Sequence, residues 1–292
     1  MIPGDDLQRL ADLVAARRDE VSAAIDQEAL ADWLYRNWYI NPPLAAQGGG
    51  DVPFDHLGSA LNALAGRAAP WEENWIVLSV SPDGSIVAAR GAQTRWQPAG
   101  QYAARARFGL PPVPGEQVSL PLVLAWIDPA TGQWAARSAE APAGPLVRFY
   151  FNADAAQVGE LVSSVLVWLI GEGLPFSLKC PGTAAGFARA DALVLYLEAS
   201  GLGPLEKKVR KAAAASGVKL GAACPALTKK VADGVALAED PGDGRSFGRS
   251  RCEILAPAVA EAIGQPRHLA QILRTAFLTA GLDPDEPWKG AA

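Results

Sequence analysis

Residues 146–152 read Leu-Val-Arg-Phe-Tyr-Phe-Asn, a stretch rich in aromatic and apolar residues. This composition predicts a strand over residues 146–151. Side chains alternate between the two faces of a strand, so Arg148, Tyr150 and Asn152 share one face and make it polar. The strand therefore presents a polar face that is a candidate for binding.

The segments after this strand indicate a sheet packed with helices. Ala153–Ile170 reads as an amphipathic helix, and strands are expected over Pro175–Lys179 and Asp191–Leu197. Helices are then expected over Pro204–Ser216 and Pro257–Gly281. The chain thus returns to helix after its last predicted strand.

The segments before residue 146 divide into helices and a hairpin. Apolar residues at three- and four-residue spacings over Leu7–Tyr39 predict two helices, and Asp55–Ala65 predicts a third. Asp83-Gly84 stands between two β-rich runs and predicts a tight hairpin turn. Further strands are expected over Val118–Ile127 and Gln133–Arg137.

Together these elements predict an α+β fold. A helical N-terminal part, residues 1–70, is followed in residues 71–292 by a mostly antiparallel sheet packed with helices. No linker-like segment separates the two parts, so one continuous globular unit is expected.

The composition limits the class of protein. The chain has 292 residues, of which 50% are hydrophobic, and 26 Lys and Arg against 31 Asp and Glu give a net charge of −5. This acidic balance argues against nucleic-acid binding, and the longest apolar stretch is too short to cross a bilayer. Three distant cysteines favour neither a disulfide framework nor a metal site. We expect a cytoplasmic protein that binds neither nucleic acid nor a membrane.

Two strand ends carry residues suited to anion chemistry. Lys179 ends one predicted strand, directly before the turn at Pro181-Gly182, and Arg189 precedes the next strand. A solvated lysine and a surface ion pair between Arg189 and Asp191 are the alternatives that the sequence leaves open.

Residues 242–252 read Gly-Asp-Gly-Arg-Ser-Phe-Gly-Arg-Ser-Arg-Cys and are the most suggestive stretch for phosphate recognition. Glycine lets the backbone approach an anion closely, and the arginine fork can hold two phosphate oxygens. Because helix is expected only from about Ala256, the stretch is interpreted as a basic loop. A mobile loop without function is the alternative.

Several separated motifs together resemble the HopA-type type III effector family, in the family's order from about residue 30 to residue 280. The motifs are Leu34-Tyr35 with Trp38-Tyr39, Arg148–Asn152, Phe176–Cys180, Arg189–Tyr196, Gly234–Pro241 and Ser246–Cys252. The resemblance supports the α+β fold class.

The resemblance implies a place in the branch of this family that acts in class V lanthipeptide and thioamitide biosynthesis. Members of that branch are phosphoserine/phosphothreonine lyases of ribosomal-peptide maturation. A separate kinase of the aminoglycoside-phosphotransferase type phosphorylates Ser or Thr of a precursor peptide, and the lyase eliminates the phosphate to leave dehydroalanine or dehydrobutyrine. No cofactor or metal is implied.

The resemblance also implies roles for individual residues. Lys179 is expected to remove the α-proton as a base, which requires its amine to be neutral. Phosphate binding is expected from five cations: Arg189, Arg249, Arg251, Arg148 and Lys229. Substrate contacts are expected from Tyr150, Asn152 and Ser246.

The sequence departs from the family's pattern at the expected acid. Many relatives carry histidine where Ser250 stands, and His56 is the substitute acid that this sequence offers, with a surface role as its alternative. Because this histidine is absent, a second hypothesis stays open: the chain is a non-catalytic subunit that binds a leader peptide or scaffolds the kinase. A virulence-type effector that acts on host phosphoproteins is a third hypothesis.

Two further sets of side chains need an interpretation. Cys180 and Cys252 flank candidate motifs, but no histidine is placed to activate either thiol, so both are expected to be buried apolar residues. The aromatic residues Tyr35 and Tyr39, with Trp33 and Trp38, are candidates to line a peptide groove.

Overall fold

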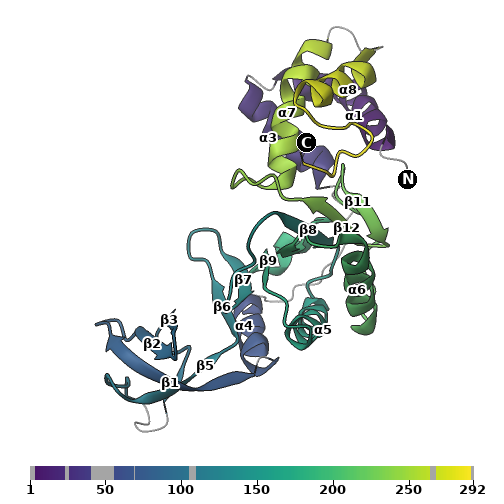
Figure 1. Ribbon diagram of the computed structural model, residues 1–292. Helices are drawn as coiled ribbons and strands as arrows, with labels where there is room; N and C mark the ends of the chain where they lie inside the picture. Colours follow the sequence, from purple (N-terminus) through teal and green to yellow (C-terminus); the bar gives the residue numbers. More distant parts are fainter. Residues whose placement is uncertain are drawn as a thin grey trace.

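The computed structural model describes residues 4–23, 26–40, 56–68, 70–104, 110–263 and 268–290. These residues form eight α-helices and two sheets whose strand pairs are all antiparallel, which confirms the α+β class. Figure 1 shows a group of helices at one end, a large sheet with helices beneath it, and a smaller sheet at the other end. Among the described helices, none is both long and apolar enough to cross a membrane.

The elements have the following bounds. The helices are α1 (Gly4–Ala16), α2 (Arg18–Ala23), α3 (Gln27–Leu34), the π-helix η1 (Tyr35–Tyr39), α4 (Leu57–Ala68), α5 (Val158–Gly171), the 3₁₀-helix η2 (Ala184–Phe187), α6 (Leu202–Ala215), α7 (Phe247–Ala262) and α8 (Leu269–Thr279). The strands are β1 (Trp71–Val80), β2 (Ile86–Arg90), β3 (Gln93–Gln97), β4 (Ala103–Ala104), β5 (Gln117–Pro121), β6 (Val123–Ile127), β7 (Gln133–Ser138), β8 (Leu146–Phe151), β9 (Phe176–Pro181), β10 (Leu193–Glu198), β11 (Lys229–Ala232) and β12 (Val235–Glu239).

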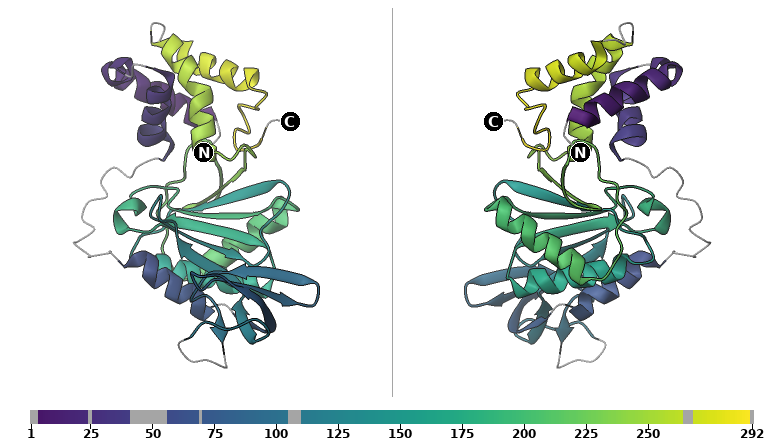
Figure 2. Two further views of the ribbon diagram at one scale, coloured as in Figure 1. Left: turned by 90° about the vertical axis from the view of Figure 1, so that its left-hand side faces the viewer. Right: turned by 90° about the vertical axis from the view of Figure 1, so that its right-hand side faces the viewer.

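The larger sheet has seven strands in the order β11-β12-β8-β10-β9-β7-β6. β8 lies inside it, between β12 and β10, and spans the residues that the sequence predicts. Val147, Phe149 and Phe151 alternate along β8 and are fully buried on one face. Figures 1 and 2 show α4, α5 and α6 on one side of this sheet. The polar residues of β8 therefore face the opposite side, towards the group of helices at the end of the molecule.

That group of helices, the helical cap, brings the two ends of the chain together. α3 packs on α7, α1 packs on α8, and α7 packs on α8. Two backbone hydrogen bonds tie the end of η1 to the large sheet's loops, from Ala226 N to the Tyr39 carbonyl (3.0 Å) and from Ala190 N to the Ile40 carbonyl (3.0 Å). The cap is thereby fixed over the polar face of the sheet.

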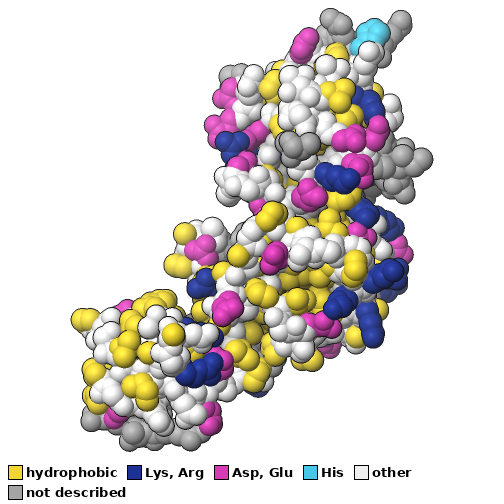
Figure 3. Space-filling view, in the orientation of Figure 1, with side chains coloured by type: hydrophobic (Ala, Val, Ile, Leu, Met, Phe, Trp, Pro, Cys, Tyr) yellow, Lys and Arg dark blue, Asp and Glu magenta, His cyan; other side chains and the backbone are white. Residues whose placement is uncertain are grey.

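The smaller sheet has the strand order β3-β2-β1-β5-β4 and its own core around Trp75. β1 and β2 form the predicted hairpin, with Gly84 at a φ of 82° in the turn. Several large apolar side chains on this unit stay exposed, including Leu78 and Trp96, and Figure 3 shows apolar side chains gathered at this end of the molecule.

The strands expected over Val118–Ile127 are present as two separate strands, β5 and β6. β5 ends at Pro121 and β6 begins at Val123, and the two strands belong to different sheets. Proline has no N–H to donate to a neighbouring strand, so it favours an end of the pairing at this point.

The helical region expected over Pro257–Gly281 contains two helices, and the first of them begins earlier than expected. α7 begins at Phe247, within the stretch interpreted as a basic loop, and α8 is a separate helix. The Ser246 side chain caps α7 by accepting a hydrogen bond from Arg249 N (3.1 Å). Residues 264–267, between the two helices, lie outside the described residues, as does Asp55 at the start of another predicted helix.

Candidate functional site

A pocket of about 130 Å³ lies between the polar face of the seven-stranded sheet and the helical cap. Its wall comes from β8, β9, β10, η1, the start of α7 and the loop between η2 and β10. The charged and hydroxyl-bearing side chains that line it are Tyr35, Tyr39, Arg148, Tyr150, Lys179, Arg189, Asp191, Tyr196 and Ser246. Several residues singled out in the sequence therefore line one cavity: Lys179, Arg189, Arg148, Tyr150, Ser246, Tyr35 and Tyr39, with Asp191 and Cys180.

Strand register places the floor of this pocket. Val194 on β10 pairs with Tyr150 on β8 and with Lys179 on β9, so these residues form one row across three strands. Tyr196, two residues further along β10, pairs with Arg148. The period of two in a strand puts all five side chains on the same face of the sheet.

Lys179 has no carboxylate partner among the described residues of the chain. Its Nζ lies 5.2 Å from the centre of the Tyr196 ring, and the Arg148 guanidinium lies 5.1 Å from the same ring. Two cations thus share one aromatic side chain, which attracts each of them without neutralising either. Lys179 is half-buried and lies two residues before the end of β9, and it lines the same pocket as Arg189.

Arg189 is held in place by Asp191 and Tyr35. Its Nε donates to one oxygen of Asp191, and its Nη2 donates to the other oxygen (2.7 Å) and to the Tyr35 hydroxyl (2.6 Å). The surface ion pair that the sequence suggested for Arg189 exists, but its carboxylate is buried and lines the pocket. These bonds use Nε and Nη2 and leave the two Nη1 hydrogens for another acceptor.

Arg148 is buried and bonded on the side away from Lys179. Its Nε donates to Asp240 (2.6 Å), and its Nη2 donates to the carbonyl of Arg245 (2.6 Å). Burial acts to lower the pKa of this guanidinium, but Tyr196, Tyr150 and Asp240 outweigh burial and raise it. Arg148 is therefore a fixed positive charge at the pocket.

The first turn of α7 closes the pocket from the cap. Gly248 lies against the Tyr39 ring so closely that a Cβ there would fall 2.2–2.5 Å from ring carbons. Tyr39 also stacks on Tyr35, with ring centres 5.3 Å apart, and contacts Phe247. Backbone N–H groups at a helix N-terminus attract anions, so this turn adds positive potential to the cation cluster.

Three phenols at the pocket, those of Tyr35, Tyr39 and Tyr150, and the thiol of Cys180 stay protonated at neutral pH. Burial, followed by the charge of Asp191, raises the pKa of Tyr35 to about 12. Burial also raises the pKa of Tyr39 and that of Tyr150, and it raises the pKa of the Cys180 thiol to about 12. Cys180 and Cys252 are buried, and a protonated thiol is a poor nucleophile.

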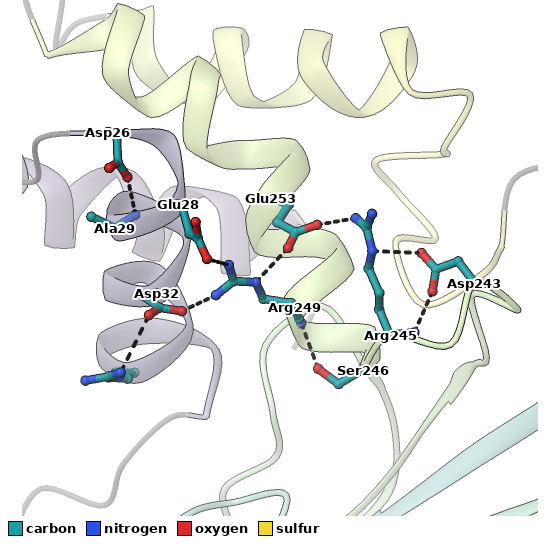
Figure 4. Close-up of polar contacts among 10 residues, drawn as sticks. Asp26, Glu28, Ala29, Asp32, Asp243, Arg245, Ser246, Arg249 and Glu253 are labelled. Carbon is teal, nitrogen blue, oxygen red and sulfur yellow. Dashed lines mark hydrogen bonds and ion pairs between the residues drawn. The ribbon is translucent and has the colours of Figure 1, made fainter.

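Arg249 does not line the pocket. Residues 249 and 251 are two positions apart on α7, which turns their side chains to roughly opposite sides of a helix with 3.6 residues per turn. Arg249 faces α3, where it pairs with Asp32 and Glu28, and it also pairs with Glu253 (2.6 Å) on its own helix. Figure 4 shows this network joining α3 to α7.

Arg251 and Lys229 also lie away from the pocket lining. The buried Arg251 donates to the carbonyls of Pro287 (3.1 Å) and Lys289 (2.6 Å), and its burial lowers its pKa to about 10. Lys229 pairs with Glu206 (2.6 Å) and lies over the ring of Trp288. Arg251 thus holds the C-terminal segment in place, and Lys229 joins α6 to that segment.

The remaining predicted positions have other neighbours. Asn152 donates to the carbonyl of Ala223 (3.1 Å), and its own backbone bonds to Gly221 and Gly234. His56 is exposed at the start of α4 and is not among the residues that line the pocket. Ser250, where relatives carry histidine, also lies outside the lining.

Sequence reasoning missed Asp240, the carboxylate that holds Arg148, and it placed the pair of Arg189 and Asp191 at the surface. Asp240 lies 92 positions from Arg148 along the chain, so no local pattern connects the two. Asp191 is only two positions from Arg189, but the sequence does not show that its carboxylate is buried. Tyr35 was named from the sequence as an aromatic candidate to line a peptide groove. Nothing in the sequence indicates that its hydroxyl bonds to Arg189.

Comparisons with known proteins identify the family. Residues 132–289 match the HopA1 effector protein family, and this match covers more than half of the chain. The chain therefore belongs to that family. The match includes β7–β12, α5–α8 and most of the residues that line the pocket.

Solved structures of effector proteins share the fold over nearly the whole chain. One is an effector protein from Pseudomonas syringae pv. tomato strain DC3000, with 16% identity, a TM-score of 0.57, and coverage of 97% of this chain and 95% of that chain. Another is from Pseudomonas syringae pv. syringae strain 61, with 13% identity, a TM-score of 0.58, and coverage of 98% and 96%. No curated protein sequence matches the chain.

Proposed function

We propose that this chain is a phosphoserine/phosphothreonine lyase. It eliminates phosphate from a precursor peptide that a separate kinase has phosphorylated, and it leaves dehydroalanine or dehydrobutyrine. The observation that carries the proposal is the contrast among the pocket's cations. Arg148 and Arg189 are each paired with a carboxylate, whereas Lys179 has no such partner among the described residues.

Lys179 is the proposed base. Elimination begins with removal of a weakly acidic α-proton, which needs a neutral amine within hydrogen-bond distance. A lysine held in an ion pair would keep its proton and could not take another. Within the part of the chain that the structure describes, Lys179 has no such ion pair, and the Arg148 guanidinium lies near the same Tyr196 ring, so a second positive charge is close to its amine.

Arg189 is the proposed phosphate ligand. Asp191 and Tyr35 hold its guanidinium rigidly, and its Nη1 hydrogens are left for the phosphate oxygens. Arg148 and the N-terminal turn of α7 add positive charge from the other sides. A preorganised donor of this type contributes roughly 2.7–4 kcal/mol to stabilising a developing negative charge.

The test uses the wild-type protein and a synthetic peptide with phosphoserine. The expected result is loss of phosphoric acid from the peptide, detected by mass spectrometry. Lys179→Ala should lower the rate by at least about 100-fold, because removal of a general base typically costs this much. Lys208→Ala is the matched control, since that lysine is exposed on α6 and pairs with Glu172. Equal rates for wild type and Lys179→Ala would contradict the assignment of the base.

A non-catalytic peptide-binding subunit is the second candidate. It is favoured by one observation, namely that neither histidine of the chain is among the residues that line the pocket. Under this hypothesis the wild-type protein binds the phosphopeptide but leaves its mass unchanged, even when the partner kinase is present. The same mass measurement therefore separates the two candidates.

A further inference from the structure

Tyrosines gather at the proposed active site. The chain has five tyrosines, and four of them line this one pocket: Tyr35, Tyr39, Tyr150 and Tyr196. Tyr39 and Tyr150 are buried, with at most 3% of their surface exposed. The ring of Tyr196 contacts Arg148 and Lys179. Tyr35 and Tyr196 are both half-buried. Tyr35 differs from the other three because its hydroxyl bonds directly to Arg189.

The geometry points to Tyr35 as the general acid of the elimination, an inference that rests on the proposed function. The Tyr35 hydroxyl accepts a hydrogen bond from Nη2 of Arg189 (2.6 Å). The guanidinium of Arg189 is the group proposed to bind the phosphate. Nη1 and Nη2 belong to one planar guanidinium, so a phosphate held through Nη1 is adjacent to the group that bonds this hydroxyl. Among the described residues, the hydroxyl proton has one acceptor, Asp191 at 3.5 Å, and this distance is too long for a strong bond. It is therefore available to a leaving oxygen.

The chemistry of the step needs such a proton. Lys179 takes the α-proton, the new double bond forms between Cα and Cβ, and the electrons of the Cβ–O bond leave with the phosphate. A phosphate dianion that leaves without a proton becomes a trianion, which is a strong base. Transfer of the Tyr35 proton to the bridging oxygen avoids this species and leaves a phenolate beside Arg189. The phenolate regains its proton from solvent, and the protonated Lys179 releases one.

The environment of Tyr35 suits both the protonated phenol before the reaction and the phenolate after it. Its raised pKa keeps the phenol protonated at neutral pH before the reaction, mainly because of burial. The Arg189 guanidinium, which also lies 5.6 Å from the centre of the Tyr35 ring, favours the phenolate once the proton has left. The stack of Tyr35 on Tyr39 holds the ring in place. No histidine is required at Ser250 or elsewhere in the lining.

The experiment separates an acid from a residue that only positions Arg189. Tyr35→Phe removes the hydroxyl and keeps the ring, and two quantities are measured for this variant and for wild type. The first is kcat for elimination from a phosphoserine peptide. The second is the affinity for the same peptide carrying a phosphonate, in which carbon replaces the bridging oxygen so that elimination cannot occur. Tyr102→Phe is the control, because its hydroxyl bonds to the Gly84 carbonyl in the small sheet.

The inference predicts that Tyr35→Phe lowers kcat by at least about 100-fold while the phosphonate peptide binds within about threefold of wild type. Tyr102→Phe should retain the wild-type kcat. A kcat within about threefold of wild type, or a loss of affinity as large as the loss of rate, would overturn the role of Tyr35. If wild type itself eliminates no phosphate, the proposed function fails, and the inference fails with it.

Discussion

At the scale of single residues, the pocket is characterised by its cationic side chains and by which of them are already paired with a carboxylate. Five cations were expected to bind phosphate from the sequence, and the structure brings only Arg148 and Arg189 to the pocket. Arg249 and Lys229 are held by carboxylates, and Arg251 by backbone carbonyls, at other places. The sequence shows where cations are, but it cannot show their partners, because those partners come from distant segments.

The buried pair of Arg148 and Asp240 makes a prediction at this scale. Their side chains are only 6% and 13% exposed, so removing the carboxylate leaves a charged guanidinium buried without its counter-ion. We expect Asp240→Ala to lower the free energy of unfolding by about 3 kcal/mol in chemical denaturation. Asp243→Ala, in the same loop but exposed, should cost about 0.5 kcal/mol. Equal effects of the two variants would contradict this account of Arg148.

At the scale of elements, the position of α7 decides the site. The residues Ser246 to Gly248 form its cap and first turn, and they meet the pocket because the helix begins at Phe247 rather than near Ala256. The glycines before and inside this turn hide the helix from sequence reasoning, because glycine is a poor helix former. By contrast, β8 and the β1–β2 hairpin could be predicted, since alternation and an Asp-Gly turn are local signals.

The contact of Gly248 with Tyr39 makes a prediction at the scale of elements. A methyl group at residue 248 would overlap the Tyr39 ring, so α7 and η1 must separate or Tyr39 must move. We expect Gly248→Ala to lower the free energy of unfolding by about 1–3 kcal/mol. Gly66→Ala is the matched control, because nothing lies within 4 Å of its Cβ position in α4. That variant should raise stability by about 0.5–1 kcal/mol, and a gain of similar size at Gly248 would rule out the close contact.

At the scale of the whole molecule, the first and last helices form one cap over the large sheet, and the small sheet extends from the other end (Figures 1 and 2). α3 and η1 pack on α7, and the paired residues Asp32 and Arg249 are 217 positions apart. η1 and the start of α7 then line the pocket together. No local sequence signal reports such an arrangement.

The separate core of the small sheet makes a prediction at this scale. Trp75 is fully buried there, beneath Arg90 and Arg95, and its cluster contains no residue of the main core. Trp75→Ala should cost about 3–5 kcal/mol within this unit. Hydrogen exchange should then show faster exchange in β1, β2 and β5, with β8 and β10 unchanged. Equal loss of protection in both sheets would show that they unfold as one unit.

The most direct test of the central claim is the fate of the peptide and the phosphate in water enriched in heavy oxygen. A synthetic phosphoserine peptide is incubated with the wild-type protein, and the masses of the product peptide and of the released phosphate are measured by mass spectrometry. Elimination at the pocket of Lys179 predicts a dehydroalanine peptide and a phosphate that carries no heavy oxygen from the water, because the Cβ–O bond breaks. A peptide that regains serine, with heavy oxygen in the released phosphate, would show hydrolysis and contradict the account.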